Sequence, residues 1–202
     1  MTLYALKPRF QGLLRPLAAR LAAAGVTANQ VTVAAAVGSV AVAGIVVWYA
    51  GCRPIFLLLP LWLFVRMGLN AIDGMLAREF GQQSRLGAYL NEICDVVSDA
   101  ASYAPFAVIE PFGLLGVGAV IFLSALSELA GVLGPAVGAS RRHDGPMGKS
   151  DRALVFGALA FWIGIGPPLP HWLSWLMVLI SLLLVITIVN RVWAGLSEGQ
   201  PG

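Results

Sequence analysis

Residues 70–99 read NAIDGMLAREFGQQSRLGAYLNEICDVVSD, and no other stretch of the chain sets so many ionisable side chains among apolar ones. Polar side chains recur in it three and four residues apart, at Asn70 and Asp73 and again at Asn91 and Asp95. Such spacing places them on one face of each of two helices. We predict that this polar face is the functional site.

The composition around this stretch is that of a membrane protein. Hydrophobic residues make up 58% of the 202 residues and charged residues only 11%, and the mean hydropathy is +0.82. These values exclude an ordinary soluble domain. We therefore expect an integral membrane protein with a single domain over residues 1–202 and no nucleic-acid partner.

The apolar runs predict an all-α bundle of six transmembrane helices. A span needs about 20 apolar residues, and six segments approach that length: 29–50, 54–78, 87–109, 111–137, 152–167 and 171–193. Residues 2–24 instead alternate leucines with basic residues at helical spacing, which predicts an amphipathic interfacial helix, broken or kinked near Pro8 and Pro16. The turn at Gly25–Asn29 offers a capping residue for the first span.

The distribution of basic residues predicts the orientation. An even number of spans puts both termini on one side, and positively charged loops face the cytoplasm. The basic residues on the side of the N-terminus are Lys7, Arg9, Arg15, Arg20, Arg78, Arg85, Arg141, Arg142, Lys149, Arg152 and Arg191. The opposite loops offer only Arg53. We expect a multi-pass protein of the bacterial inner membrane, with both termini and the site cytoplasmic.

The second and third spans bring four oxygen-bearing side chains together. The two spans are antiparallel, so Asp73 and Asn91 lie at similar depth, and Asn70 and Asp95 lie about one turn, roughly 5.4 Å, deeper. Ionisable groups inside a bilayer are costly unless they are paired or line a wet cavity. Oxygen ligands suit Mg²⁺ or Mn²⁺, so the pattern predicts a divalent-metal site.

The same stretch carries a family signature. The pattern D-x-x-D-G-x-x-A-R-x8-G-x-x-x-D-x-x-x-D is matched at Asp73, Gly74, Ala77, Arg78, Gly87 and Asp95. The chain thus resembles the CDP-alcohol phosphatidyltransferases. It departs from the pattern at Asn70 and Asn91, where the family has aspartate.

The resemblance implies roles for individual residues. Asp73 and Asp95 would be metal ligands and the catalytic pair, with Asp95 also the general base toward an acceptor hydroxyl. Asn70 and Asn91 would be weaker metal ligands. The residues implied to bind the nucleotide are Gly74, Ala77, Arg78, Gly87 and Asn29. In this family an alcohol attacks the β-phosphorus of a CDP-linked donor and CMP leaves.

The asparagines lower the charge of the site. Four aspartates would balance two divalent ions, whereas Asp73 and Asp95 supply only two negative charges, because an amide is a neutral ligand. Either one ion binds tightly or another acid contributes. Glu92 is the best-placed acid, since Glu92, Asp95 and Asp99 form one stripe of the third span.

Other charged residues have two interpretations each. Arg66 and Asp99 lie deep in neighbouring spans, which predicts a buried ion pair, with Glu128 as a rival partner; alternatively Arg66 grips a substrate phosphate. The basic loop 141–152 either attracts anionic lipid or, through Lys149 and Arg152, binds an acceptor or donor phosphate.

The expected function is transfer of a phosphatidyl or substituted phosphate group from a CDP-linked donor, CDP-diacylglycerol in preference, to an alcohol or polyol phosphate. The expected cofactor is one or two Mg²⁺ or Mn²⁺ ions, and small residues in the later spans predict a homodimer. The alternative is a catalytically silent member that binds CDP-lipid or nucleotide as a regulator or assembly partner. A small transporter is disfavoured, since the polar groups cluster at one mouth.

Overall fold

The computed structural model describes residues 3–198, with side chains from residue 10 onward. No strand occurs in this range. Four short 3₁₀ segments, η1 (Arg53–Leu57), η2 (Ala104–Val108), η3 (Gly134–Val137) and η4 (His171–Ser174), adjoin the longer helices. The α-helices of the described range are α1 (Leu3–Ala23), α2 (Ala28–Trp48), α3 (Leu58–Glu79), α4 (Arg85–Tyr103), α5 (Gly113–Val132), α6 (Lys149–Ile165) and α7 (Trp175–Glu198).

Side-chain caps fix where the helices around the polar stretch begin. The Thr27 hydroxyl accepts a hydrogen bond from the Gln30 amide at 3.2 Å, and the Gln30 side chain accepts one from the Thr27 amide at 2.9 Å. This capping box confirms that the Gly25–Asn29 turn caps the helix that follows. Ser84 starts α4 in the same way, accepting from the Gly87 amide at 2.9 Å.

Four helical segments are long and apolar enough to cross a membrane: Ala28–Trp48, Arg53–Glu79, Gly113–Val132 and His171–Glu198. Helix α4 differs from these because it carries Arg85, Glu92, Asp95 and Asp99. Helix α6 differs because it has only 17 residues and opens on the charged run Lys149–Arg152. The acidic residues that lower the hydropathy of α4 lie in the stretch of the predicted site.

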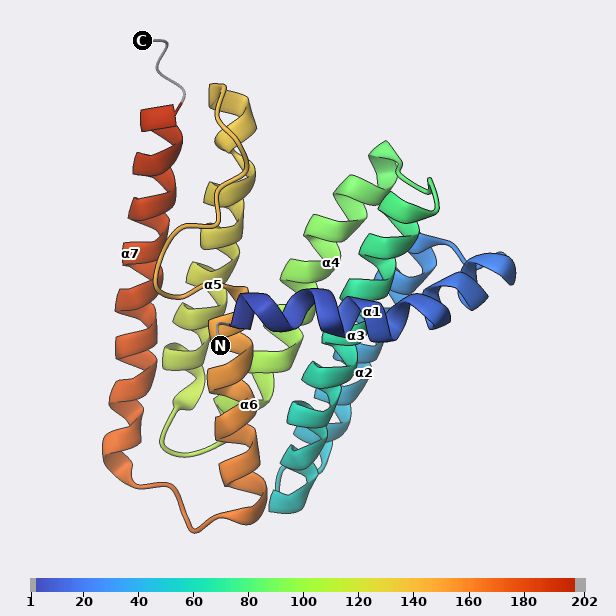
Figure 1. The fold of residues 1–202 in the computed structure, drawn as a ribbon. Coiled ribbons are helices and arrows are strands. Elements are labelled where there is room, and N and C mark those ends of the chain that lie inside the picture. The colour runs from blue at the N-terminus through green and yellow to red at the C-terminus, as the bar shows by residue number, and fades with distance from the viewer. Residues whose placement is uncertain (1–2, 199–202) are drawn as a thin grey trace.

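The helices pack into one bundle, in which α2 contacts both α3 and α4, and α5 contacts both α4 and α7 (Figure 1). Since lipid tails are as apolar as the side chains, close packing and hydrogen bonds hold such helices together. At one α2–α3 contact, Gly38 leaves room for the Trp62 ring, whose Nε1 donates to the Ser39 hydroxyl at 2.9 Å. Tyr103 of α4 stacks on Phe156 of α6 with a centroid distance of 4.1 Å.

Helix α1 lies across the other helices rather than along them (Figure 1). It packs on α3, where Phe10 meets Phe64 edge to face at 6.2 Å and Arg15 Nε donates to Glu79 at 3.0 Å. Of the two expectations near Pro8 and Pro16, a break or a kink, the break is wrong: the chain is helical throughout Leu3–Ala23. A single proline removes one hydrogen bond of the helix, and the tertiary contacts of α1 offset that loss.

Candidate active site

The Asp95 carboxylate on α4 receives three positively polarised groups on one oxygen. Its Oδ1 contacts the Lys149 ammonium, the Arg66 guanidinium at 3.5 Å and the Asn70 amide nitrogen at 3.4 Å. Among the described residues, no donor forms a hydrogen bond with its Oδ2. Asp95 is therefore anchored through one oxygen and keeps the other available.

Asp73 on α3 has a different environment. Its residue is 6% exposed, and its Oδ2 accepts a hydrogen bond from the Thr32 hydroxyl of α2 at 2.8 Å. No ion pair to Asp73 forms among the side chains that the structure describes, although Asp95 and Lys149 are close enough to act on it electrostatically. A buried carboxylate without a paired cation is costly, so Asp73 is suited to hold a metal ion.

The two asparagines use their nitrogens and spare their oxygens. Asn70 donates from Nδ2 to Asp95, and Asn91 donates from Nδ2 to Glu92 at 3.4 Å. Each amide carbonyl oxygen thus remains available as a neutral ligand. Together with the free oxygens of Asp73 and Asp95, these are the ligand atoms of the predicted metal site, and all-oxygen ligands are the kind that Mg²⁺ and Mn²⁺ prefer.

These candidate ligands carry enough negative charge for one divalent ion and not for two. Within residues 10–198, no group of three or more His, Cys, Asp or Glu side chains is close enough to hold a metal. The candidate ligands are two carboxylates supplemented by two amides. An ion held there would offset the negative charge that Asp73 leaves unpaired.

Behind this cluster, a chain of buried ion pairs links five helices. Arg66 of α3 donates to Asp99 of α4 at 2.6 Å, and Arg152 of α6 donates to Asp99 at 2.8 Å and to Glu128 of α5 at 2.9 Å. Arg191 of α7 lies 3.6 Å from the other oxygen of Glu128. The predicted Arg66–Asp99 pair is confirmed, and Glu128 is the partner of Arg152 rather than of Arg66.

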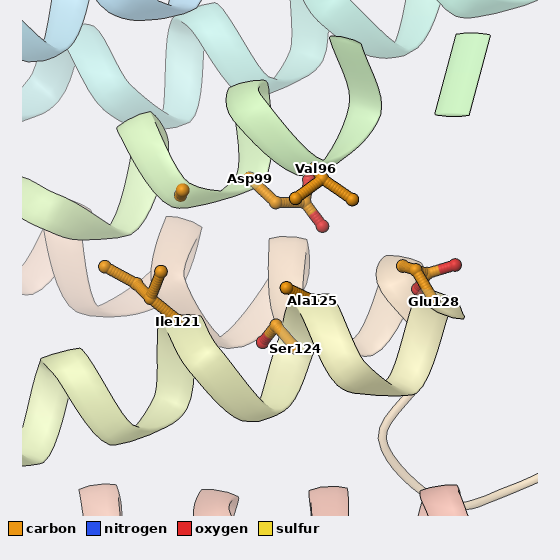
Figure 2. A pocket seen from close by; sticks show the side chains of 7 residues that line it. Val96, Asp99, Ile121, Ser124, Ala125 and Glu128 are labelled. Carbon is orange, nitrogen blue, oxygen red and sulfur yellow. The ribbon is translucent and has the colours of Figure 1, made fainter. Parts of the chain in front are cut away.

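A small cavity opens beside this network, between α4 and α5 (Figure 2). Its walls include Asp99, Glu128 and the Ser124 hydroxyl, which is buried without a hydrogen-bond partner among the described residues. Its volume of about 10 Å³ is close to the minimum that holds one water molecule. The cavity is too small for a nucleotide or a lipid headgroup, so it belongs to the supporting network and not to the substrate site.

The residues expected to bind nucleotide fall into two adjacent pairs. A Cβ on Gly74 would come within 2.6 Å of the Arg78 guanidinium, and a Cβ on Gly87 would come within 2.7 Å of the Asn29 amide oxygen. Each glycine therefore lies directly under the polar side chain of its partner. Ala77 instead packs in the apolar core between α1, α2 and α3, which favours a structural role.

Arg152 and Lys149, which were expected to bind phosphate beside the loop that precedes α6, have different environments. Arg152 is 0% exposed, and its guanidinium forms ion pairs with Asp99 and Glu128. These contacts favour a structural role over phosphate binding. Lys149 is the first residue of α6, and its side chain is 32% exposed. Its ammonium contacts Asp95.

Residues 138–148 connect η3 to α6 and are fastened to the neighbouring helices. Arg141 forms two hydrogen bonds with Glu92 of α4, one of them at 2.9 Å. Arg142 donates to Asp144 at 2.9 Å, which lowers the pKa of that carboxyl and raises the pKa of Arg142. Arg142 and Asp144 therefore both stay charged at neutral pH. The Glu92 carboxylate is paired with the guanidinium of Arg141.

The replacement Glu92→Gln should consequently leave the metal requirement unchanged. Glutamine keeps one hydrogen bond to Arg141 but lacks the negative charge that a metal ligand supplies. The measurement is CMP release against Mn²⁺ concentration for the purified variant and the unmodified protein. A rise in the half-saturating Mn²⁺ concentration of about tenfold or more would instead assign Glu92 to the metal.

Two contacts of the cluster have no counterpart in the sequence reasoning. Thr32 lies three residues after Asn29 on α2, so the shared helical face was a signal for its contact with Asp73. Arg191 gave no such signal beyond being a charge at the end of a long apolar run. Its partner Glu128 lies on another helix, and only the packing of α5 on α7 brings the two together.

The chain is similar in sequence to the members of a known protein family. The family model described as CDP-alcohol phosphatidyltransferase matches residues 25–187. The inner membrane protein YnbA of Escherichia coli (strain K12) is 46% identical over 191 residues, which cover 95% of this chain and 94% of that protein. A phosphatidylinositol phosphate synthase of Mycobacteroides abscessus is 30% identical over 193 residues, covering 92% of this chain and 84% of that one.

Solved structures agree on the fold. The phosphatidylinositol phosphate synthase of Mycobacterium tuberculosis with CDP-DAG bound superposes with a TM-score of 0.74 at 24% identity, over 91% of this chain and 93% of that one. The same enzyme with manganese and citrate gives a TM-score of 0.70 over 91% and 88%. The family match and the two relatives together show that the chain belongs to the CDP-alcohol phosphatidyltransferases.

Proposed function

We propose that this chain transfers a phosphatidyl group from CDP-diacylglycerol to an alcohol, with release of CMP. The observation that carries the proposal is that Asp73 on α3 and Asp95 on α4 are close enough to interact electrostatically, and each has one oxygen without a side-chain hydrogen bond among the described residues. The M. tuberculosis relative is described with CDP-DAG bound, which supports the choice of donor.

The residues of this chain would divide the reaction between them. The oxygen of the acceptor bonds to the β-phosphorus of the donor, the bond from that phosphorus to the bridging oxygen breaks, and CMP departs. Asp95 takes the proton of the acceptor hydroxyl, and Lys149 and Arg66 hold its carboxylate in place. A Mg²⁺ or Mn²⁺ ion bound by Asp73, Asp95, Asn70 and Asn91 would offset the charge on the phosphoryl oxygens and on the leaving group.

The nucleotide would lie over the two glycine pairs. Gly74 with Arg78 and Gly87 with Asn29 present polar side chains above backbone that lacks a Cβ. Arg78 is exposed at the end of α3, where its charge is free to meet a phosphate. For the acceptor, relatives named phosphatidylinositol phosphate synthase favour a polyol phosphate, and the partly exposed Lys149 would supply a cation for it.

We propose six transmembrane spans, with α4 and α6 crossing beside the four apolar segments. Charged groups of α4 and α6 are paired inside the bundle, which removes the cost of burying them. Helix α1 would lie in the interface on the cytoplasmic side, because it crosses the bundle and exposes Arg15 and Arg20 (Figure 1). The name of the E. coli relative supports the bacterial inner membrane.

The positive residues also support a cytoplasmic site. Arg53, at the opposite end of the bundle, donates to the carbonyls of Ile163 and Pro167 at 3.1 and 2.9 Å. These hydrogen bonds engage Arg53 in holding the loop, and the other positively charged loop residues lie at the end that holds the site. Both termini would share that side.

We also propose a homodimer through the later spans. An apolar groove of about 350 Å³ lies between α5, η3 and α7, and its lining includes Leu129, Leu133 and Val192. Side chains of a second copy would fill this groove more closely than lipid tails would. Light scattering in detergent should give the mass of two chains, and the mass of one would refute the dimer.

The activity is tested with purified protein in detergent, CDP-diacylglycerol, Mn²⁺ and a panel of alcohols that includes inositol phosphate, glycerol phosphate and serine. We expect CMP release that requires both the metal and one acceptor. CDP-diacylglycerol binding without CMP release in the whole panel would instead support the silent family member, which the contacts of Lys149 and Arg66 on Asp95 would then explain.

A further inference from the structure

A cation that contacts Asp95 in this structure is a side chain of the protein, the ammonium group of Lys149. Lys149 opens α6, and the Gly148 amide donates to Asp151 Oδ2 at 2.9 Å, which fixes the start of that helix. From there the Lys149 ammonium contacts Asp95 Oδ1, although its side chain is 32% exposed and water is available to it. The ammonium therefore takes a position beside a carboxylate where a metal ion would also be attracted.

Positive charge is distributed unevenly over the two aspartates. Asp95 has two cations, since Arg66 lies 3.5 Å from the same oxygen that Lys149 contacts. Asp73 has a hydroxyl from Thr32 and no ion pair among the described side chains. The negative charge that remains for an added ion is therefore that of Asp73.

The wider cluster is electrically balanced before any metal binds. It contains four carboxylates and four cations; seven of them are joined by ion pairs, and the eighth, Asp73, is close enough to Asp95 and Lys149 to interact with them electrostatically. The members are Asp73, Asp95, Asp99, Glu128, Arg66, Lys149, Arg152 and Arg191. One divalent ion adds two positive charges, which a pyrophosphate group balances. A second ion would add two more at a depth where uncompensated charge is costly.

We propose that Lys149 is a built-in cation that takes the place of a second metal ion, so that this active site binds one divalent ion. The inference rests on the proposed function for the location of the metal site and goes beyond it in the number of ions. Asn70 and Asn91 fit this arrangement, because aspartates there would leave two negative charges that Lys149 alone does not balance.

The direct test is the number of Mn²⁺ ions bound per chain, measured with Mn²⁺ alone by electron paramagnetic resonance of the free ion and by calorimetry. We expect one ion for the unmodified protein and for Lys149→Arg. Lys149→Met should bind its ion about tenfold more tightly or better, because a repelling charge is removed. The triple variant Asn70→Asp, Asn91→Asp, Lys149→Met should bind two.

Two further variants separate a local effect from a general one. Arg85→Met removes an exposed cation of α4 that forms no ion pair among the described residues, and it should leave the Mn²⁺ affinity unchanged. Asn70→Asp with Asn91→Asp, with Lys149 kept, should bind the second ion at least about tenfold more weakly than the triple variant. If Lys149→Met does not fold, Lys149→Gln takes its place in the comparison.

The proposal is overturned if the unmodified protein binds two ions or none, or if Lys149→Met and Arg85→Met change the affinity equally. Its failure is distinct from that of the proposed function, because no lipid enters the measurement. A chain that binds one Mn²⁺ with these variant effects but releases no CMP would uphold the inference and refute the activity. A chain that releases CMP with two ions bound would do the reverse.

Discussion

Asp73→Asn should lower CMP release by about 10²–10³-fold or more while leaving the amount of folded protein almost unchanged. The Asp73 carboxylate is buried and has no ion pair among the described side chains, so its charge is available for the metal. Asparagine has the same shape, keeps an oxygen for the Thr32 hydroxyl and removes only the charge. The measurements are CMP release across an Mn²⁺ titration and elution of the variant from a sizing column.

Thr32→Val is the matched control. Valine has nearly the shape of threonine and removes only the hydroxyl that donates to Asp73 at 2.8 Å. Loss of a partner that orients a metal ligand costs about 10–100-fold in affinity or activity, so this variant should fall between the unmodified protein and Asp73→Asn. Near-normal CMP release by Asp73→Asn at every Mn²⁺ concentration would exclude Asp73 as a ligand.

Asp99→Asn should reduce the free energy of unfolding by about 3–5 kcal/mol. Arg66 and Arg152 both donate to this carboxylate, at 2.6 and 2.8 Å, and both guanidinium groups are buried. The amide of asparagine would leave two buried cations with less negative charge between them. For a chain of this length, such a loss lowers the unfolding temperature by about 6–20 °C.

Glu79→Gln provides the comparison for Asp99→Asn. Glu79 pairs with Arg15 at the protein surface, where the two side chains are 39% and 60% exposed. Exposed pairs contribute about 0–1 kcal/mol, so the unfolding temperature should hardly move. Thermal unfolding in detergent measures both variants. Equal shifts for Asp99→Asn and Glu79→Gln would show that the buried network does not stabilise the bundle.

The helices were predictable from the sequence because their signals are local. Apolar runs predicted the positions of α2 to α7, with ends that differ from those of the helices by up to about six residues, and the turn that contains Thr27 predicted the start of α2. The Arg66–Asp99 pair was predictable too, since both residues lie far inside apolar helices that neighbour in the chain. Local pattern also overstated the effect of Pro16, because it ignores the packing of α1 on α3.

The contacts that join distant helices were not predictable. Asp95 on α4 and Lys149 on α6 are separated in the sequence by the whole of α5, and only the placement of α6 against the polar face of α4 brings them together. The same holds for Arg152, whose position in a basic loop suggested phosphate binding. Its side chain turns into the bundle, where two carboxylates on α4 and α5 balance its charge.

The central claim is that Asp73 and Asp95 together hold a divalent ion that binds a CDP-linked donor. Its most direct test is a structure of the protein with Mn²⁺ and CDP-diacylglycerol, in which anomalous scattering locates the ion. The account predicts an anomalous peak within coordination distance of a carboxylate oxygen of both residues, with the pyrophosphate against it. A peak at Glu92, at the Asp99–Glu128 network, or at neither aspartate would contradict it.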